Sequence, residues 1–193
     1  MELESFITNK AMSVHLNMSF DLEHFAATHD NCVIKSSCPW RCTFYSRGYT
    51  MNMYQSGYFI LFTRSMDEAD VRREMVRLFG IEPVSVVLRN LVVKFYHPGP
   101  IVLEVLYDAL SGKTVHDFFQ SGCAKGGAVP LVIMDKQTFS ALRLRPFPRT
   151  RITLSVFSSG AIGVAGLKSD EDLARTREYI CDTLIPLYAR ASA

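Results

Sequence analysis

Two copies of one hairpin pattern constrain the fold of this chain more than any other feature of its sequence. Residues 54–61 and residues 157–164 lie 103 positions apart, and each copy places a Ser-Gly pair between two strand-like runs. A Ser-Gly pair in this setting is typical of a tight turn between two strands. The chain is therefore expected to consist of two structural units of similar design.

Two further pairs of segments extend the repeat. Residues 66–70 and 169–173 follow the hairpins, and their acidic side chains suit the first turn of a helix, with Ser169 as an N-cap. Residues 8–11 and 89–92 each contain an Asn and are expected to begin a strand, but they lie only 81 positions apart. Each of these two strands leads into a short amphipathic segment.

An insertion explains the two different spacings. Because 81 and 103 differ by 22, the second half is expected to hold about that many extra residues. Segment 111–130 is the natural place for them, since several glycines in a long stretch predict a loop. The sequence thus predicts a divergent first repeat over residues 1–80 and a second repeat over residues 81–193, with the insertion around 111–130.

The remaining pattern predicts the fold class. Residues 40–45 and 141–145 each resemble a strand, so both halves have the order strand, short helix, several strands, long helix. The last helix, about residues 170–188, has apolar residues near a 3.6-residue spacing and can bury one stripe, made of Leu173, Tyr179, Ile180, Leu184 and Leu187. This order predicts an α+β fold, an antiparallel sheet with its helices on one face. The other face of the sheet must meet something else.

Composition bounds the class of protein without identifying its ligand. The chain has 193 residues, 48% of them hydrophobic, enough to bury a substantial core. Its formal net charge is only +2, so charge alone would not suggest DNA. Five Cys without regular spacing, and no secretory leader, fit reduced thiols in the nucleus or cytosol. No apolar stretch approaches the roughly 20 residues of a membrane span.

Three motifs resemble the TATA-box-binding protein family. The most specific is the Phe-Ser-Ser-Gly of residues 157–160, followed by the Ala-Gly-Leu-Lys-Ser of residues 165–169, which resembles a hairpin of that family. The Arg-Asn-Leu-Val of residues 89–92 is similar to the opening of a family repeat. Residues 100–106 resemble a further segment of its second repeat. The resemblance covers nearly the whole chain at low identity.

The resemblance implies a fold and a mode of binding. In that family two repeats form a saddle, with a curved antiparallel sheet of about ten strands and helices on the convex face. The concave face of the sheet binds the minor groove of DNA, and the convex side receives other transcription factors. The same arrangement is what the resemblance implies for this chain.

The resemblance also implies residue roles near the centre of the sheet. Asn9 and Asn90 match two family asparagines that hydrogen-bond acceptors in the minor groove, where A·T pairs present only acceptors. Val92 matches a valine that contacts the floor of the groove. Its counterpart in the first repeat is Ala11, which fills less space, so looser contact is expected there.

Aromatic side chains take a second role by the same resemblance. Phe139 and Phe157 match a pair of phenylalanines that wedge into a base step and kink the duplex. In the first repeat Tyr54 stands in place of the hairpin phenylalanine, and Trp40 is the predicted counterpart of the other. Interpreted without the repeat, all four would be core aromatics.

Basic and groove-facing positions complete the predicted site. Arg145 and Arg151 fall where the family places basic residues at the edge of the sheet, which implies contact with phosphates. A solvated hairpin would look the same. Ala165 stands where the family has a groove-facing Thr, and Phe62 stands at the equivalent place in the first repeat. These departures bear on the sequence preference of the site.

The resemblance implies a general transcription initiation factor. Such a protein binds and bends A·T-rich promoter DNA, recruits transcription factor IIB-like and other general transcription factors, and acts in the nucleus. It requires no enzyme activity, no cofactor, no small-molecule substrate and no membrane. One alternative stays open: an interaction protein of the same fold, with weak or lost DNA binding, that acts through protein partners.

Two other kinds of site are weaker interpretations of the sequence. His29 and Cys32 have a spacing that suits a metal, with His24, Cys38 and Cys42 nearby, but no CxxC pair accompanies them and no metal site is predicted. Cys123 lies in a glycine-rich stretch that lacks the ending of a phosphate-binding loop. It has no partner at a spacing typical of a catalytic group, so a thiol enzyme is not predicted.

Overall fold

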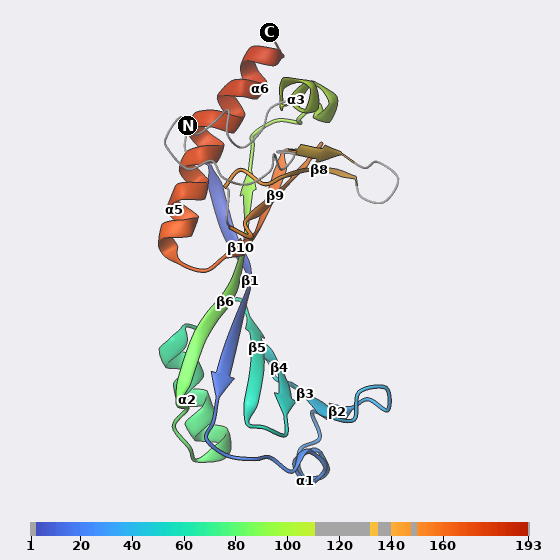
Figure 1. Ribbon diagram of the computed structural model, residues 1–193, viewed down its shortest axis with the longest axis vertical. Helices are drawn as coiled ribbons and strands as arrows, with labels where there is room; N and C mark the ends of the chain where they lie inside the picture. Colours follow the sequence, from blue (N-terminus) through green and yellow to red (C-terminus); the bar gives the residue numbers. More distant parts are fainter. Residues whose placement is uncertain (1–2, 111–131, 135–139, 148–149, 193) are drawn as a thin grey trace, which may run out of the picture. The chain divides into compact units, whose positions relative to one another are not determined.

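One ten-stranded antiparallel sheet organises the molecule (Figure 1). The computed structural model describes residues 3–110, 132–134, 140–147 and 150–192. The order of the strands in the sheet is β2-β3-β4-β5-β1-β6-β10-β9-β8-β7. The second five strands repeat the order of the first five in mirror image, so the α+β class and the single sheet that the sequence predicts are confirmed.

The elements alternate along the chain as follows. The strands are β1 (Glu4–His15), β2 (Cys32–Ile34), β3 (Arg41–Tyr45), β4 (Tyr49–Tyr54), β5 (Tyr58–Thr63), β6 (Ser85–Tyr96), β7 (Val132–Met134), β8 (Ala141–Leu144), β9 (Thr153–Phe157) and β10 (Ala161–Leu167). The helices are α1 (Leu22–Thr28), α2 (Glu68–Phe79), α3 (Leu103–Leu110), α5 (Asp170–Glu178), the π-helix η1 (Tyr179–Leu184) and α6 (Ile185–Ala191). Within the described residues, no helix is long and apolar enough to cross a membrane.

The chain divides into two compact units. Unit 1 comprises Met1–Ile7 and Val92–Ala193, and unit 2 comprises Thr8–Leu91. Both long strands, β1 and β6, therefore contribute residues to both units. The predicted boundary at residue 80 falls between α2 and β6. The division into compact units falls instead within β1 and within β6.

The core of unit 2 lies between its strands and its two helices. Met51 and Met53 of β4 and Phe59 and Leu61 of β5 are fully buried, together with Val71 and Met75 of α2. Alternate residues of a strand point to opposite faces, so one face of these strands packs on the helices. Leu22 and Phe25 of α1 join the same core.

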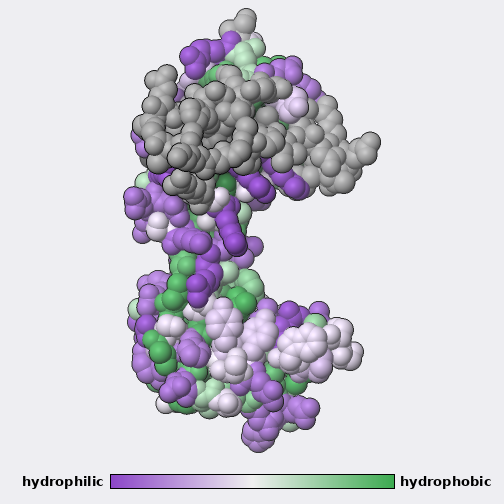
Figure 2. All heavy atoms as spheres, viewed as in Figure 1, coloured by the Kyte–Doolittle hydropathy of each residue, from purple (hydrophilic) through white to green (hydrophobic). Residues whose placement is uncertain are grey.

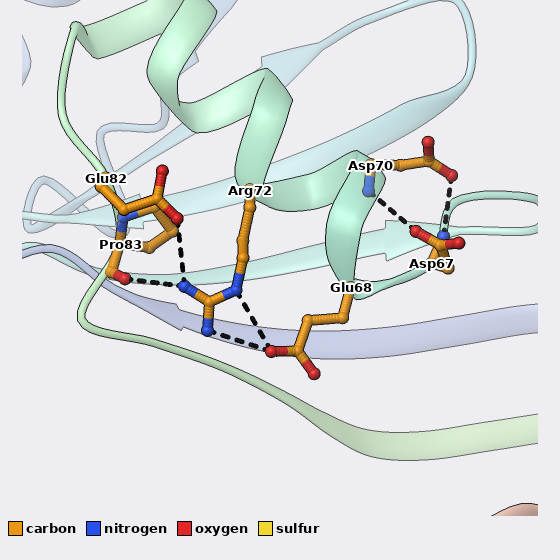
Figure 3. A network of polar contacts seen from close by, with 6 residues as sticks. All are labelled: Asp67, Glu68, Asp70, Arg72, Glu82 and Pro83. Atoms are coloured by element: carbon orange, nitrogen blue, oxygen red, sulfur yellow. Dashed lines mark hydrogen bonds and ion pairs between the residues drawn. The ribbon is translucent and has the colours of Figure 1, made fainter.

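Helix α2 is fixed at its start and along its side by polar contacts (Figure 3). Asp67 accepts a hydrogen bond from the Asp70 N–H and Asp70 accepts one from the Asp67 N–H, which makes a reciprocal cap. The guanidinium of Arg72 donates to Glu68, to Glu82 and to the carbonyl oxygen of Pro83. Arg72 thus ties α2 to the segment that leads into β6.

The core of unit 1 is built in the same way. Leu154 and Val156 of β9 and Ile162 and Val164 of β10 are fully buried. Arg177 of α5 lies 5.9 Å from the ring centroid of Phe95 and donates a hydrogen bond to Ser5. The C-terminal helices therefore cover the strand face that carries Phe95.

The predicted last helix is interrupted rather than uniform. Residues 170–191 are helical throughout, but the middle six form the π-helix η1, which widens the turn. Of its predicted apolar stripe, Tyr179, Ile180 and Leu184 are buried, whereas Leu173 and Leu187 are only half-buried.

The predicted starts of the first strand in each half are wrong. β1 begins at Glu4 and β6 at Ser85, several residues before Thr8 and Arg89. The extra residues are held by packing: Leu3, just before β1, is 3% exposed, and Val86 joins the core of unit 2. The sequence close to Asn9 and Asn90 does not indicate these packing contacts, so the earlier starts of the two strands could not be predicted from it. The predicted insertion at 111–130 lies outside the described residues.

The two hairpins match each other in detail. The Leu16 N–H donates to the Gly57 carbonyl and the His97 N–H donates to the Gly160 carbonyl, both at 2.9 Å. The donors lie 81 positions apart and the acceptors 103 apart, the two spacings found in the sequence. Gly57 and Gly160 have φ of +74° and +88° and would bring a Cβ against backbone oxygens, so both turns require glycine.

Candidate nucleic-acid interface

The helices leave one face of the strands uncovered in each unit, and we call these surfaces the unit 1 and unit 2 open faces. In unit 1 the open face carries the alternate residues of β9 and β10, whose neighbours are buried. These residues are Thr153, Ser155, Phe157, Ala161, Gly163 and Ala165. They are half-buried, as expected for side chains on a face of a sheet that no helix or second sheet covers.

The centre of the unit 1 open face is a low floor. Gly163 is paired with Ser155, and Ala165 with Thr153. A Cβ built on Gly163 would lie 3.9 Å from Phe157, an ordinary contact, so no packing constraint demands glycine at this position. Small side chains therefore let a flat ligand approach the backbone closely.

Phe157 stands at the end of this floor. It is the last residue of β9, is half-buried, and is paired with Ala141 of β8. Its predicted partner in a wedge, Phe139, lies outside the described residues. Because Phe157 lies beside small residues on the uncovered face of the sheet, its ring can contact a ligand instead of packing in the core.

The two predicted β6 residues occupy the side of that strand away from the helices. Leu91, Val93 and Phe95 are buried, and the alternate positions Asn90 and Val92 are half-buried. Asn90 belongs to unit 2 and Val92 to unit 1. Both lie on β6, one of the two strands that contribute residues to both units.

The unit 2 open face carries the half-buried alternate residues of β4 and β5, which are Thr50, Asn52, Tyr54, Tyr58, Ile60 and Phe62, and the predicted unit 2 residues lie on or beside it. Asn9 is half-buried on β1, and Ala11, which is paired with Phe62 of β5, is buried with 9% of its surface exposed. Tyr54 is half-buried at the end of β4. Trp40 is 61% exposed in the turn before β3, which makes it one of the most exposed aromatics of the described chain.

The register bears on the predicted equivalence of Trp40 and Phe139. Arg41 is paired with Tyr54 in unit 2, and Ala141 is paired with Phe157 in unit 1. Residues of β3 and β8 at equivalent places are thus 100 positions apart. By that spacing Trp40 corresponds to Ser140, so the register places Trp40 one position away from the equivalent of Phe139.

Arg145 and Arg151 are both exposed at the edge of unit 1. Arg145 directly follows β8, and Arg151 comes shortly before β9. The Arg151 carbonyl passes so close to Gly166 that a Cβ there would clash with it, and Gly166 has φ of +92°. The close crossing fixes the backbone of Arg151 and leaves its guanidinium at the surface.

Carboxylates are concentrated outside the strands, a feature that the near-zero net charge conceals. Glu4 is the one acidic residue in the ten described strands. The same strands carry five cations: Lys10, Arg41, Arg89, Lys94 and Arg143. Acidic residues gather instead on the helices, above all on α2 and α5. The pattern was not predicted from the sequence, although the predicted strands differ from the predicted helices in their content of Asp and Glu.

The predicted metal candidates are not gathered into a site. Among the described residues, no group of three or more His, Cys, Asp or Glu side chains could hold a metal ion. His29 hydrogen-bonds the Phe25 carbonyl and stacks on the Phe25 ring. Burial raises the pKa of the Cys32 thiol to about 12, so the thiolate that a metal prefers is disfavoured. Cys123 lies outside the described residues.

Comparison with known proteins points to one fold. No family model matches the chain, and no curated protein matches its sequence. The solved structure of Methanococcus jannaschii TBP matches it with a TM-score of 0.70 and 19% identity, over 95% of this chain and 99% of that one. A second structure, an A. aeolicus tRNASec in complex with M. kandleri SerRS, covers 99% of this chain and 31% of its own at 14% identity, but its TM-score of 0.33 carries no argument. The chain therefore has the fold of the TATA-box-binding proteins.

Proposed function

We propose that this protein is a transcription initiation factor that binds promoter DNA in the minor groove and bends it. One observation carries the proposal: Phe157 stands at the end of a floor made of Ala161, Gly163 and Ala165. Proteins that bind the minor groove insert apolar side chains between base steps and kink the duplex. A floor of small residues lets the backbone of the sheet come close to the opened groove.

The charge distribution supports a polyanionic ligand. Strand residues are nearly free of carboxylates, whereas Arg145 and Arg151 are exposed beside the unit 1 open face. Within the described residues neither arginine forms an ion pair. Contacts of this kind position a protein on the phosphate backbone and make its affinity fall with rising salt.

The asparagines supply the chemistry for reading the groove. A·T pairs present only acceptors in the minor groove, and the amide NH₂ groups of Asn9 and Asn90 are donors that fit them. Val92 then contacts the floor of the groove on the unit 1 side, while Ala11 contacts it more loosely on the unit 2 side. Preference for A·T-rich DNA follows.

The helices offer the partner surface in this proposal. They carry most of the acidic residues, and the arginines of α2 are paired with carboxylates, which makes the helices a poorer surface for DNA than the strands. Transcription factor IIB-like partners and other general factors bind there instead. In this proposal the protein acts in the nucleus, where promoter DNA lies. No enzymatic step is part of the proposal.

The test measures binding and bending of short duplexes at two salt concentrations. One duplex is rich in A·T and one in G·C, and a fluorescence pair on the DNA ends reports the bend. We expect tighter binding and a larger bend with the A·T-rich duplex, and a logarithmic salt slope of about −0.9 for each phosphate contacted. The Asn90→Ala variant should weaken binding, whereas Arg73→Ala on α2 should not. If neither duplex binds, the alternative of a protein-binding platform replaces this proposal.

A further inference from the structure

Aromatic rings cover the unit 2 open face at positions where unit 1 has almost none. Trp40 and Tyr45 are 61% and 47% exposed, and Tyr54, Tyr58 and Phe62 are half-buried. Figure 2 shows pale residues of intermediate hydropathy gathered over the strands of unit 2. Four of the rings come from β3, β4 and β5, so one sheet holds them in place, and Trp40 borders them in the turn directly before Arg41.

The rings are available to a ligand. Tyr54 and Tyr58 have ring centroids 6.1 Å apart and planes tilted by 37°, so they are not stacked on each other. Trp40 is in no ring pair of the described structure, and it is the single tryptophan of the chain. Flat, partly exposed rings on a sheet are the surfaces on which unpaired bases stack.

The same rings make the unit 2 open face a poor floor for a duplex. Tyr58, Ile60 and Phe62 rise from β5, where a duplex floor would need small side chains. Phe62 is paired with Ala11 on one side and Thr50 on the other, so its ring cannot sink into the sheet. A single strand can place its bases between such side chains because it has no partner strand to keep paired.

Cations on this face have no carboxylate beside them. Arg41 is paired directly with Tyr54, and β2, β3, β4 and β5 contain no acidic residue. Among the described residues Arg41 forms no ion pair, in contrast to Arg72, Arg73 and Arg77 of α2. An aromatic surface with unshielded cations fits a polyanion with aromatic groups better than an apolar protein segment.

A basic depression adjoins the rings. It has a volume of about 610 Å³ and is lined by Asn9, Thr50 and Phe62 from the unit 2 open face, together with Arg47 and Arg64. Both arginines are exposed, and neither forms an ion pair within the described chain. The hydroxyls of Ser46 and Ser65 lie in the same lining. Two guanidinium groups beside hydroxyls are the donors that a phosphate accepts from.

We propose that the unit 2 open face binds single-stranded nucleic acid. Bases stack on Trp40, Tyr54 and Tyr58, and a backbone phosphate enters the depression between Arg47 and Arg64. This combination of rings and a basic groove is how single strands are bound without reading their sequence. The inference goes beyond the proposed duplex binding and does not depend on it. The rings and the depression lie in unit 2, whereas the wedge and the floor that carry the duplex proposal lie in unit 1, although Asn9, which the duplex proposal also uses, lines the depression.

Trp40 provides a direct test, because all tryptophan emission of the protein comes from this residue. The purified full chain is titrated with short oligo(dT) and with oligo(U), and separately with a duplex of equal nucleotide content. Both single strands should quench the emission and bind more tightly than the duplex, and a difference between them would tell DNA from RNA as the preferred source. Unchanged emission with both single strands, or equal quenching by the duplex, overturns the proposal.

Variants locate the site independently of the fluorescence signal. Binding of labelled oligo(dT) followed by anisotropy should weaken on the order of tenfold in Tyr54→Leu with Tyr58→Leu, which keeps apolar volume but removes the rings. Arg47→Ala with Arg64→Ala should lower the logarithmic salt slope by about 0.7 for each phosphate that the variant no longer binds. Arg73→Ala removes a cation from α2 and should leave both values unchanged. If it lowers the slope as much as the double variant, the depression is not the phosphate site.

The result separates this inference from the proposed function. A protein that binds oligo(dT) but does not bend a duplex keeps the inference and loses the proposed function. A protein that bends the duplex while oligo(dT) leaves Trp40 unaffected does the reverse. Thermal unfolding midpoints of the leucine variants, compared with the parent, show whether a loss of binding reflects loss of fold.

Discussion

The open faces of the two units share a backbone and differ in nearly every side chain that matters for a ligand. Along β5 the half-buried positions on the open face are Tyr58, Ile60 and Phe62. The equivalent positions of β10, each 103 residues later, are Ala161, Gly163 and Ala165. The hydrogen bonds and register that define these positions are the same in both units. One scaffold thus presents a low floor in unit 1 and a set of rings in unit 2.

The buried faces of the same strands explain why the side chains of the open faces can differ between the two units. Phe59 and Leu61 of β5 are fully buried, and so are Ile162 and Val164 of β10. These side chains hold the helices to the sheet, so a polar replacement would cost several kcal/mol through lost burial. Side chains on the open faces make no such contribution. They can change with the ligand while the fold stays constant.

The largest effect is expected from giving unit 1 the side chains of unit 2. The double variant Gly163→Ile with Ala165→Phe places the bulk of Ile60 and Phe62 on the low floor. Because a Cβ at Gly163 meets only ordinary contacts, the protein should still fold. A·T-rich duplex affinity should fall by about 100-fold or more, which is about 2.7 kcal/mol. Anisotropy titration and the end-to-end fluorescence assay measure the loss of binding and of bending.

The reciprocal change in unit 2 is the matched control. Ile60→Gly with Phe62→Ala lowers the unit 2 open face without touching unit 1. It should leave duplex affinity the same or improve it by about a few fold, since the floor then admits the groove. If this pair also abolishes duplex binding, the two open faces contribute alike and the comparison fails.

A smaller effect is expected at the ends of the hairpins. Phe157 and Tyr54 occupy equivalent positions, but only Phe157 stands beside a low floor. Phe157→Ala should lower duplex affinity about tenfold and reduce the bend, because the wedge that unstacks the base step is removed. Tyr54→Ala should lower it by less than about threefold. Equal losses in the two variants would show that both units kink the DNA.

Much of the fold could be predicted from the sequence, because its signals are local. Gly57 and Gly160 mark the two turns, and the alternation of apolar residues after each turn sets which face is buried. Ser169 caps α5 as predicted, with its side chain accepting from the Asp172 N–H. These features depend on residues close together in the chain.

The parts that could not be predicted depend on contacts between distant residues. The early start of β1 depends on contacts such as the one from Arg177 to Ser5, 172 positions away. The depression with Arg47 and Arg64 joins two turns to β1, and neither turn alone resembles a site. Arg41 gains its place opposite Tyr54 from strand register. Basic residues in the first half are few in sequence, but the fold concentrates several of them at one surface.

The smallest predicted effect concerns how each unit anchors its long helix. In unit 2 the Tyr49 hydroxyl donates to Glu74 of α2 at 2.5 Å, and Arg77 donates to the same carboxylate. The equivalent of Tyr49 in unit 1 is Ile152, which is buried and apolar. Tyr49→Phe should lower the free energy of unfolding by about 1–2 kcal/mol, because Glu74 loses a donor at a half-buried site. Urea unfolding measures this change.

The anchor of unit 2 should also be sensitive to acid. Hydrogen bonds from Arg77, and then from Tyr49, hold the pKa of Glu74 below its usual value. A carboxylate with a lowered pKa stabilises the fold above its unfolded-state pKa, and this contribution is lost as the pH falls through the folded-state value. In the parent, stability should therefore fall more steeply between about pH 5 and pH 3 than in Glu74→Gln, whose side chain does not titrate. Urea midpoints measured across this range for both proteins decide the point. Parallel pH profiles would mean that the carboxylate of Glu74 contributes no more to the stability of unit 2 than a neutral side chain does.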